Sequence, residues 1–438
     1  MKKWVLFIVI FTCFFPYPTK AETVIHIPKG HSIQEAIDNS PSGSVIKVEK
    51  GTYKESLTIT KPIQLKAEGK VVIDGNHQGH VIHIKANDVK LEGFTIIHSN
   101  KNAKDAGIFL DQVEKTSIKN NHLQQVYYGI YVNGGHDHHI KNNTITSLHE
   151  HFSKRGNGIH LLGTTGNVIE NNKMTMVQDG VYFDEANENQ ITQNQVTGSR
   201  YALHFMFSKD NSVTKNRLNE NINGLMIMNS EKLIIQHNQL SKNLNYRGYG
   251  ALIFDSDDVV MRNNNVTYNH TGISLQDARN VKVLQNTIAG NFIGLEVRGE
   301  SKDNLISNNQ FVGNIMQNKI STEGVYLDNG QIGNYWDDQH SYDLDGNGIG
   351  DLPYQTNSGY ERLLEKYPHY QFYFESPAMN LWHSVEKMFP TIAKSTGLDR
   401  YPLTDSSGKG NFGMGTIIVL SVFSVILLFL QWKRRVHS

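Results

Sequence analysis

The sequence predicts an all-β fold in which the chain winds into a parallel β-helix with coils of about 22 residues. From about residue 105 to residue 314, a small residue followed by apolar, polar and apolar positions recurs at this spacing. A fixed period of this length is typical of a solenoid, whose repeats pack only against their neighbours. The clear repeats begin at Gly107-Ile108, Gly129-Ile130, Gly158-Ile159, Gly180-Val181, Ala202-Leu203, Gly224-Leu225, Ala251-Leu252, Gly272-Ile273 and Gly294-Leu295.

A column of asparagines supports the same fold. One asparagine stands about 14 residues after each start, and stacked side-chain amides can hydrogen-bond along such a column. Asparagine also tolerates the left-handed backbone conformation that a sharp corner needs. We expect one corner of every coil to be built on these residues: Asn121, Asn143, Asn172, Asn194, Asn216, Asn238, Asn264, Asn286 and Asn309.

Short runs of apolar, polar and apolar residues within each repeat have the period of two that is typical of strands. The runs are too short for helices, and Asn, Gly and Asp separate them at positions that favour turns. Less regular runs at residues 71–73, 81–84 and 89–91 predict further coils before the first clear one. Every repeat therefore contributes two or three short strands.

The two ends of the predicted solenoid need caps, because an open end would expose a strand edge. The motif SIQEAI at residues 32–37 predicts a short amphipathic helix. The segment from this helix to residue 59 resembles the start of many secreted right-handed β-helix proteins of the pectin-lyase-like type. We therefore expect a capped right-handed β-helix over residues 22–332, followed by a C-terminal segment over residues 333–403.

This C-terminal segment contains an apolar stripe with helical spacing. The stripe could cap the last coil, or it could dock into a groove on a membrane partner. Both roles remain open for its residues, which are Leu381, Val385, Met388 and Phe389.

Composition and targeting signals limit the function. The chain has 42 basic and 42 acidic residues, so no net field attracts nucleic acid. The basic start, the apolar run to Phe15 and the small residue Ala21 predict a secretory signal peptide over residues 1–21. The only cysteine, Cys13, lies inside it, so we expect no disulfide in the mature chain.

The other end of the chain predicts a membrane anchor. Residues 415–432 are almost wholly apolar, which is just long enough for one transmembrane helix. The basic tail at residues 433–438 predicts a cytoplasmic C-terminus, and residues 404–414 form a flexible linker. We expect the body of the protein on the extracytoplasmic face of the cell membrane, held by this single pass.

Strand alternation assigns every second residue after the small one to the outer surface. The middle of this outer face carries His204, Met206, Met226 and Met228 on adjacent coils, hereafter the Met/His group. An exposed apolar group of this kind usually marks a binding site. The group is flanked by His160, Tyr182 and Asp184, and the first outward column is Phe109, Tyr131, His160, Tyr182, His204, Met226, Ile253, Ser274 and Glu296.

Three interpretations of the Met/His group remain open. Thioether sulfurs and a neutral imidazole are soft ligands that suit Cu(I) better than Mg²⁺, Ca²⁺ or Zn²⁺. The methionines could instead be adaptable contacts for a partner protein. They could also be core residues that lie beneath a covering loop.

A second candidate metal site follows the last coil. Asp343, Asp345, Asn347 and Asp351 alternate with glycines in one loop. Loops of this design supply carboxylate and backbone oxygens to Ca²⁺. The bidentate glutamate of an EF-hand is missing, so the alternative is a plain Gly/Asp turn.

The outer face does not predict an enzyme. Polysaccharide lyases and epimerases need clustered carboxylates, or a carboxylate–Ca²⁺ pair with a basic residue. The outward acids are two or more coils apart, which separates neighbouring pairs by roughly 10 Å or more. These acids are Asp111, Asp184, Asp255 and Glu296.

Four strings carry a family resemblance. These are GNYWDDQHSYDLDGNGIGDLPY at residues 333–354, RYALHFMFSKDN at 200–211, GLMIMNS at 224–230 and SPAMNLWHSVEKMFP at 376–390. In combination they resemble the NosD family. The resemblance covers nearly all of the mature chain. It implies an extracytoplasmic maturation factor without catalysis of its own. Its partners would be an ABC transporter, a copper chaperone lipoprotein and apo nitrous oxide reductase, whose copper–sulfur centre is assembled. The membrane span departs from the usual soluble periplasmic form.

The alternative function is a membrane-anchored polysaccharide lyase or epimerase, or a carbohydrate-binding β-helix protein. Tyr131 and Tyr182 on the outer face would then stack against sugar rings.

Overall fold

The structure, a computed structural model, describes residues 23–101, 105–148, 151–339, 342–356, 367, 376–378, 381 and 397–404. Across these ranges, no helix is long and apolar enough to cross a membrane. The expected signal peptide, the apolar run at residues 415–432 and the tail at residues 433–438 lie outside the described residues, as does the linker apart from Thr404.

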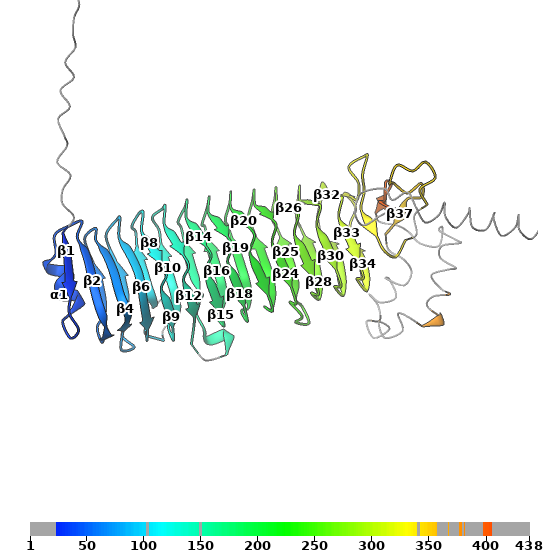
Figure 1. Cartoon of the computed structure of the whole chain (residues 1–438). Coiled ribbons are helices and arrows are strands. Elements are labelled where there is room, and N and C mark those ends of the chain that lie inside the picture. The colour runs from blue at the N-terminus through cyan, green and yellow to red at the C-terminus, as the bar shows by residue number, and fades with distance from the viewer. Residues whose placement is uncertain are drawn as a thin grey trace, which may run out of the picture.

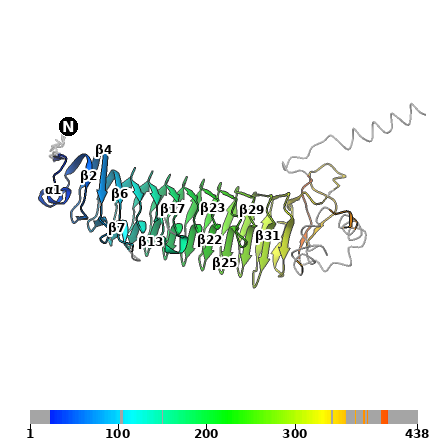
Figure 2. The same ribbon diagram turned by 90° about the horizontal axis from the view of Figure 1, so that it is seen from below.

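The chain forms a right-handed parallel β-helix, as the 22-residue repeat predicts. The coils stack into a long rod with its N-terminal cap at one end (Figures 1 and 2). One side of the rod is a 12-stranded parallel sheet. Its strands are β3 (Leu57–Ile59), β5 (Ile82–Ile84), β7 (Ala106–Asp111), β10 (Tyr128–Asn133), β13 (Ile159–Leu162), β16 (Asp179–Asp184), β19 (Tyr201–Met206), β22 (Asn223–Met228), β25 (Tyr249–Phe254), β28 (Thr271–Gln276), β31 (Ile293–Arg298) and β34 (Met316–Ile320).

The other two sides belong to one 24-stranded sheet, because the long early strands bend from one side to the next. These early strands are β1 (Val24–Ile27), β2 (Val45–Tyr53), β4 (Gln64–Asp74) and β6 (Lys90–Ile97). The second side then continues through β8 (Ser117–Lys119), β11 (His139–Lys141), β14 (Val168–Glu170), β17 (Gln190–Thr192), β20 (Ser212–Thr214), β23 (Ile234–Gln236), β26 (Val260–Arg262), β29 (Lys282–Leu284), β32 (Asn304–Ser307) and β35 (Val325–Tyr326). The third side continues through β9 (His122–Gln124), β12 (Thr144–Thr146), β15 (Lys173–Thr175), β18 (Gln195–Thr197), β21 (Arg217–Asn219), β24 (Gln239–Ser241), β27 (Asn265–Thr267), β30 (Thr287–Ala289), β33 (Gln310–Val312) and β36 (Tyr335–Trp336).

The interior of the rod is a stack of apolar columns, one for each inward position. Phe183 and Phe205, for example, are paired in register on β16 and β19, and their rings stack with centroids 4.2 Å apart. Both side chains are fully buried. Burial of such columns along the whole rod is the main source of stability for a fold with small, repeated local contacts.

The small-residue column reflects close approach between coils. A Cβ atom on Gly250 would lie 2.6 Å from the carbonyl oxygen of Gly272 in the next coil, so a side chain there would clash. The sequence-based start at Ala251 was therefore wrong by one residue, because two small residues follow each other there. Register pairs Leu252 with Ser274 and Phe254 with Gln276, so Leu252 and Phe254 face outward in place of Ile253 and Asp255.

The predicted column of asparagines, hereafter the asparagine ladder, is confirmed, with Asn334 as a further member. Each ladder amide donates to the side-chain oxygen of the next, as Asn194 does to Asn216 at 3.1 Å. The predicted left-handed conformation is wrong for these residues: the residue before each of the nine predicted ladder asparagines has the positive φ, for example Gln193 (56°) and Lys215 (58°). The corner therefore selects asparagine for its hydrogen bonds, not for its backbone.

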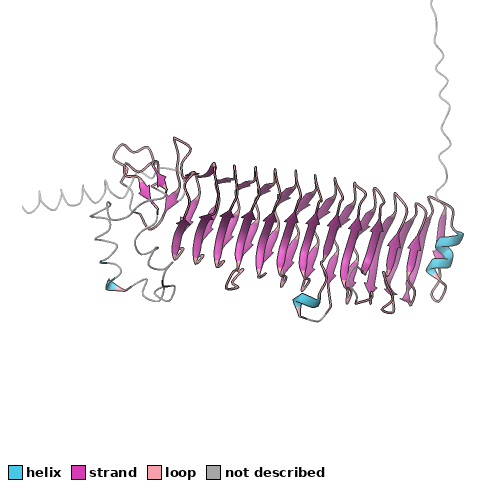
Figure 3. Cartoon of the chain, turned by 180° about the vertical axis from the view of Figure 1, so that it is seen from behind, coloured by secondary structure: helices cyan, strands magenta, loops and turns pink. Residues whose placement is uncertain are grey.

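The ends of the rod are closed in different ways. At the N-terminus, α1 (Ile33–Asn39) buries Ile33 and Ile37, and the Ser32 side chain caps it by accepting from the Glu35 N–H. A second short helix, η1 (Phe152–Lys154), projects from the side of the rod (Figure 3). At the C-terminal end, β37 (Tyr354–Gln355) pairs with β38 (Leu398–Asp399) in an antiparallel ribbon.

Candidate functional site

The outer surface of the 12-stranded sheet carries a continuous row of ring side chains. Phe109, Tyr131, His160, Tyr182 and His204 occupy successive strands in register. The centroids of neighbouring rings lie between 4.7 Å and 5.1 Å apart. Beyond His204 the same column continues into the Met/His group.

The Met/His group lies on strands β19 and β22. His204 is directly across from Met226, and Met206 is directly across from Met228. His204 and Met226 are 6% and 7% exposed, whereas Met206 and Met228 are half-buried. The group thus has a covered half and an open half. This arrangement is intermediate between an exposed patch and a covered core, the two alternatives that the sequence left open.

A buried ion pair holds the imidazole of His204. Its Nδ1 lies 3.0 Å from Oδ2 of Asp179, whose side chain is only 1% exposed. Arg200 donates to both oxygens of the same carboxylate, at 2.9 Å from Nε and 2.7 Å from Nη2. The other ring nitrogen, Nε2 of His204, is buried and has no hydrogen-bond partner among the described residues.

Electrostatics keep this ion pair charged. Burial acts to raise the pKa of Asp179, but hydrogen bonds from His204 and Arg200 outweigh burial and leave the pKa below its ordinary value. Burial likewise acts to lower the pKa of Arg200, and its bond to Asp179 raises it further than burial lowers it. Asp179 is therefore a carboxylate at neutral pH, and Arg200 balances its charge.

Two of the flanking residues, His160 and Tyr182, are neutral at pH 7. Burial lowers the pKa of His160 to about 4, and its Nδ1 accepts from the Asn157 amide at 3.1 Å. Burial, with a smaller effect from the charge of Asp184, raises the pKa of Tyr182 to about 12. The Tyr182 hydroxyl donates to the Met206 sulfur at 3.4 Å. Burial also raises the pKa of Asp184 above its ordinary value.

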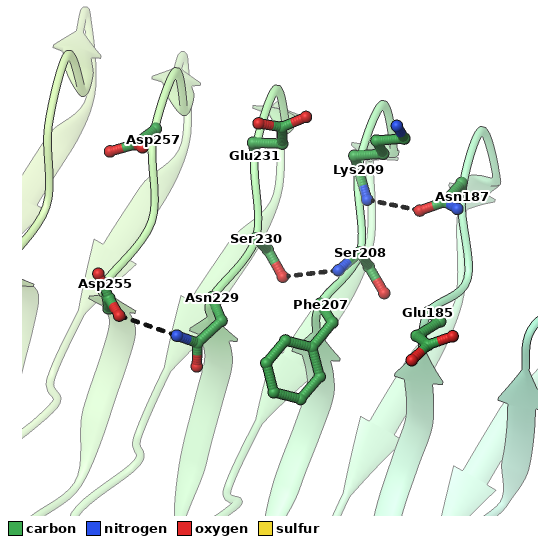
Figure 4. A pocket seen from close by; sticks show the side chains of 10 residues that line it. All are labelled: Glu185, Asn187, Phe207, Ser208, Lys209, Asn229, Ser230, Glu231, Asp255 and Asp257. Carbon is green, nitrogen blue, oxygen red and sulfur yellow. Dashed lines mark hydrogen bonds between the residues drawn. The ribbon is translucent and has the colours of Figure 1, made fainter.

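An open groove of about 660 Å³ lies beside the Met/His group, along the turns that follow β16, β19, β22 and β25 (Figure 4). Phe207 follows Met206 directly, and its side chain is 55% exposed. Asn229 follows Met228 and donates to Asp255 at 2.9 Å. The charged residues that line the groove are Glu185, Glu231, Asp255, Asp257 and Lys209, so its net charge is negative.

The expected calcium loop is closed by its own backbone. Asp343 accepts from the N–H groups of Gly346 (2.7 Å), Asn347 (3.1 Å) and Gly348 (2.8 Å). These bonds, that from Gly348 first, hold the pKa of Asp343 below its ordinary value. Asp351 accepts from the Leu344 N–H at 2.7 Å.

The structure therefore does not support the predicted calcium site at Asp343, Asp345, Asn347 and Asp351. Backbone donors occupy both carboxylate oxygens of Asp343 and one oxygen each of Asp345 and Asp351. Over the described part of the chain, no three His, Cys, Asp or Glu side chains converge as a metal site.

Of the predicted docking stripe, only Leu381 belongs to the described residues, and it is 66% exposed. The others, Val385, Met388 and Phe389, lie outside them.

Comparison with known proteins now places the chain in a family. The family model described as periplasmic copper-binding protein (NosD) matches residues 141–341, which include the whole Met/His group. The "Probable ABC transporter binding protein NosD" of Stutzerimonas stutzeri is 37% identical over 374 residues, or 81% of this chain and 85% of that protein. The chain belongs to the NosD family. The NosD protein of Pseudomonas aeruginosa is 34% identical and covers 81% of this chain and 86% of its own length.

The NosD relatives are named as binding proteins associated with an ABC transporter, not as enzymes, and the family description is periplasmic and copper-binding. A model of the right-handed β-helix region also matches residues 70–174.

Among solved structures, the A-modules of the mannuronan C-5 epimerases AlgE4 and AlgE6 of Azotobacter vinelandii are similar in fold. Their TM-scores are 0.54 and 0.53 at 16% and 15% identity, over 67% and 68% of this chain and 93% of each module. At this identity the likeness shows the fold alone.

Sequence reasoning missed Asp179 and Arg200. Asp179 is the first residue of β16, and Arg200 lies in the corner before β19, where the strict alternation of strand faces does not hold. The one available signal was the acid directly before Gly180, at a position that holds tyrosine or asparagine in the coils that follow, namely Tyr201, Asn223 and Tyr249.

Proposed function

We propose that this NosD-family protein binds Cu(I) as cargo at the Met/His group, as a step in the maturation of nitrous oxide reductase. In this role it would receive copper from a chaperone lipoprotein and work with an ABC transporter in assembling the copper–sulfur centre of the apo-reductase. The predicted signal peptide and C-terminal span would hold it at the extracytoplasmic face of the membrane.

The observation that carries this proposal is the buried Nε2 of His204, which has no hydrogen-bond partner in the described part of the chain. Buried polar atoms in native structures nearly always have a partner, so an orphaned atom needs an explanation. Nε2 belongs to a group with three thioether sulfurs on the same two strands. Imidazole and thioethers together are a donor set suited to Cu(I).

A Cu(I) titration of the full-length protein against a competing chelator tests the proposal. The variant with Met206→Ser, Met226→Ser and Met228→Ser should bind Cu(I) at least about 100-fold more weakly, because it removes all three thioethers. Met176→Ser is a matched control, since Met176 is also half-buried but lies at the corner between β15 and β16. Equal affinity in the triple variant and the parent would place any copper site elsewhere.

The ring row supports carbohydrate binding less well. Its rings meet one another at tilted or edge-on angles of 47° to 77°, and Tyr131 is only 8% exposed. Few ring faces are therefore open for a sugar to stack on.

A further inference from the structure

We propose that Asp179 and Arg200 are positioning residues that fix His204 in its Nδ1-protonated tautomer, so that Nε2 is the atom that binds Cu(I). The inference rests on the proposed copper site. It adds two residues outside the Met/His group that decide which nitrogen of its imidazole is available.

The first step concerns the proton between His204 and Asp179. An ionised carboxylate can only accept hydrogen bonds, and this one already accepts two from Arg200. Nδ1 of His204 lies 3.0 Å from Oδ2 of Asp179. The hydrogen between them therefore belongs to the imidazole.

The second step concerns Nε2. In a neutral imidazole with a proton on Nδ1, Nε2 carries a bare lone pair. A proton on Nε2 would create a buried N–H with no acceptor among the described residues. The burial of His204 thus favours the form in which the lone pair is free for a metal ion. A carboxylate on the far nitrogen also raises the basicity of an imidazole ligand.

The third step concerns the orientation of the ring. The ring centroid of Tyr182, on the neighbouring strand, lies 4.8 Å from that of His204. The Tyr201 ring meets the imidazole edge-on, with a centroid distance of 4.9 Å. The guanidinium of Arg200 lies over the Tyr201 ring at 4.3 Å while it grips Asp179. These contacts oppose a ring flip that would exchange the two nitrogens. They also keep the charge of buried Asp179 compensated, without which the carboxylate would be strongly destabilised.

The test is nitrogen NMR of the copper-free, full-length protein labelled with ¹⁵N-histidine. The signals of His204 are assigned by their loss in His204→Gln. We expect a protonated Nδ1 and an unprotonated Nε2 in the parent. Asp179→Asn offers an amide that can donate to Nδ1, so it should shift His204 toward the other tautomer and weaken Cu(I) binding by about 10- to 100-fold.

Arg200→Gln is a second variant, which leaves the buried carboxylate of Asp179 in place. It should move both readouts in the same direction, because the Asp179 carboxylate loses the two hydrogen bonds that hold it in place against Nδ1. Asp328→Asn is the matched control: Asp328 is gripped by Arg400 in a similar pair, at 2.6 Å and 3.1 Å, far along the rod. This control should change thermal stability but neither the tautomer nor the Cu(I) affinity.

A parent protein with the proton on Nε2 would overturn the inference. So would folded Asp179→Asn and Arg200→Gln variants that both keep the parent tautomer and affinity. A parent that binds no Cu(I) would refute the proposed function instead, and the nitrogen spectrum would still decide the tautomer.

Discussion

At the scale of single residues, two groups compete for the sulfur of Met206. The Tyr182 hydroxyl donates to it at 3.4 Å, and a bound Cu(I) would use the same lone-pair electrons. Tyr182 also packs its ring beside His204. The hydroxyl therefore weakens Met206 as a ligand, while the ring supports the site.

Tyr182→Phe separates these two effects. We expect Cu(I) affinity to rise about two- to fivefold, because a net hydrogen bond is worth about 0.5–1 kcal/mol and a thioether is a weak acceptor. The measurement is the same chelator competition. Tyr131→Phe, in the same ring row, is the control and should leave affinity unchanged. Weaker binding in Tyr182→Phe would mean that the hydroxyl helps to hold Met206 in place for copper.

At the scale of the element, the feature that repeats in every coil is the corner built on a ladder asparagine. The side chain of each ladder asparagine forms hydrogen bonds to the coils on both sides. The buried polar groups of one coil therefore depend on neighbouring coils for their hydrogen bonds. Asn216, for instance, donates to Ile191 O and to Asn238 Oδ1, and its own oxygen accepts from the backbone and side chain of Asn194. The ladder thereby couples neighbouring coils, which in a solenoid are the only partners available.

Asn216→Ala should lower the free energy of unfolding by about 2–4 kcal/mol. The substitution leaves several buried backbone groups without partners, at about 1–3 kcal/mol for each group. Asn265→Ala is a suitable comparison, because Asn265 is exposed on β27, directly after ladder residue Asn264. Its effect should stay within about 0.5 kcal/mol. Equal shifts of the denaturant midpoint in the two variants would contradict the role given to the ladder.

At the scale of the whole molecule, one carboxylate caps the asparagine ladder at the C-terminal end of the rod. Asp399 comes from the C-terminal segment and accepts from the backbone N–H of Asn334, the last ladder member, at 2.7 Å. It also accepts from the indole of Trp336 at 2.9 Å. Asp399 is fully buried, and burial raises its pKa to about 6 despite these hydrogen bonds. The ladder therefore ends on an acid that is costly to ionise.

This pKa gives stability a pH dependence of known sign. A folded-state pKa above the unfolded value of about 3.9 means that Asp399 contributes fully below about pH 4 and loses that contribution as the pH rises through about 6. Asp399→Asn removes the titration. From pH 4 to pH 7, the unfolding free energy of the variant should therefore gain on that of the parent by about 2–3 kcal/mol.

Taking the difference between variant and parent removes the histidines that also titrate in this range. His138 and His160, whose pKa values burial lowers to about 4, act equally in both proteins. Asp343→Asn serves as the control, because backbone hydrogen bonds hold the pKa of Asp343 below its ordinary value. It should show no comparable trend above pH 4. A flat difference curve for Asp399→Asn would refute the assigned role of this carboxylate.

The sequence alone determined the features that recur in every coil. The β-helix, the asparagine ladder and the neighbourhood of His204, Met206, Met226 and Met228 all follow from a fixed period. In a solenoid, residues one period apart become neighbours, so the linear pattern specifies contacts between coils. The NosD resemblance likewise rests on strings that can be read directly, and comparison confirmed the family.

Only the tertiary structure decided what happens where the period fails. Asp179 contacts His204 from the start of β16, and Arg200 holds Asp179 from the corner before β19, where alternation no longer predicts the direction of a side chain. Asp399 reaches Asn334 across 65 residues of sequence, a contact that no local pattern contains. In the Asp343 loop, side-chain direction was again decisive, because the Asp343 carboxylate accepts from backbone N–H groups of its own loop. Direction and long-range contact depend on packing, and a one-dimensional pattern does not specify them.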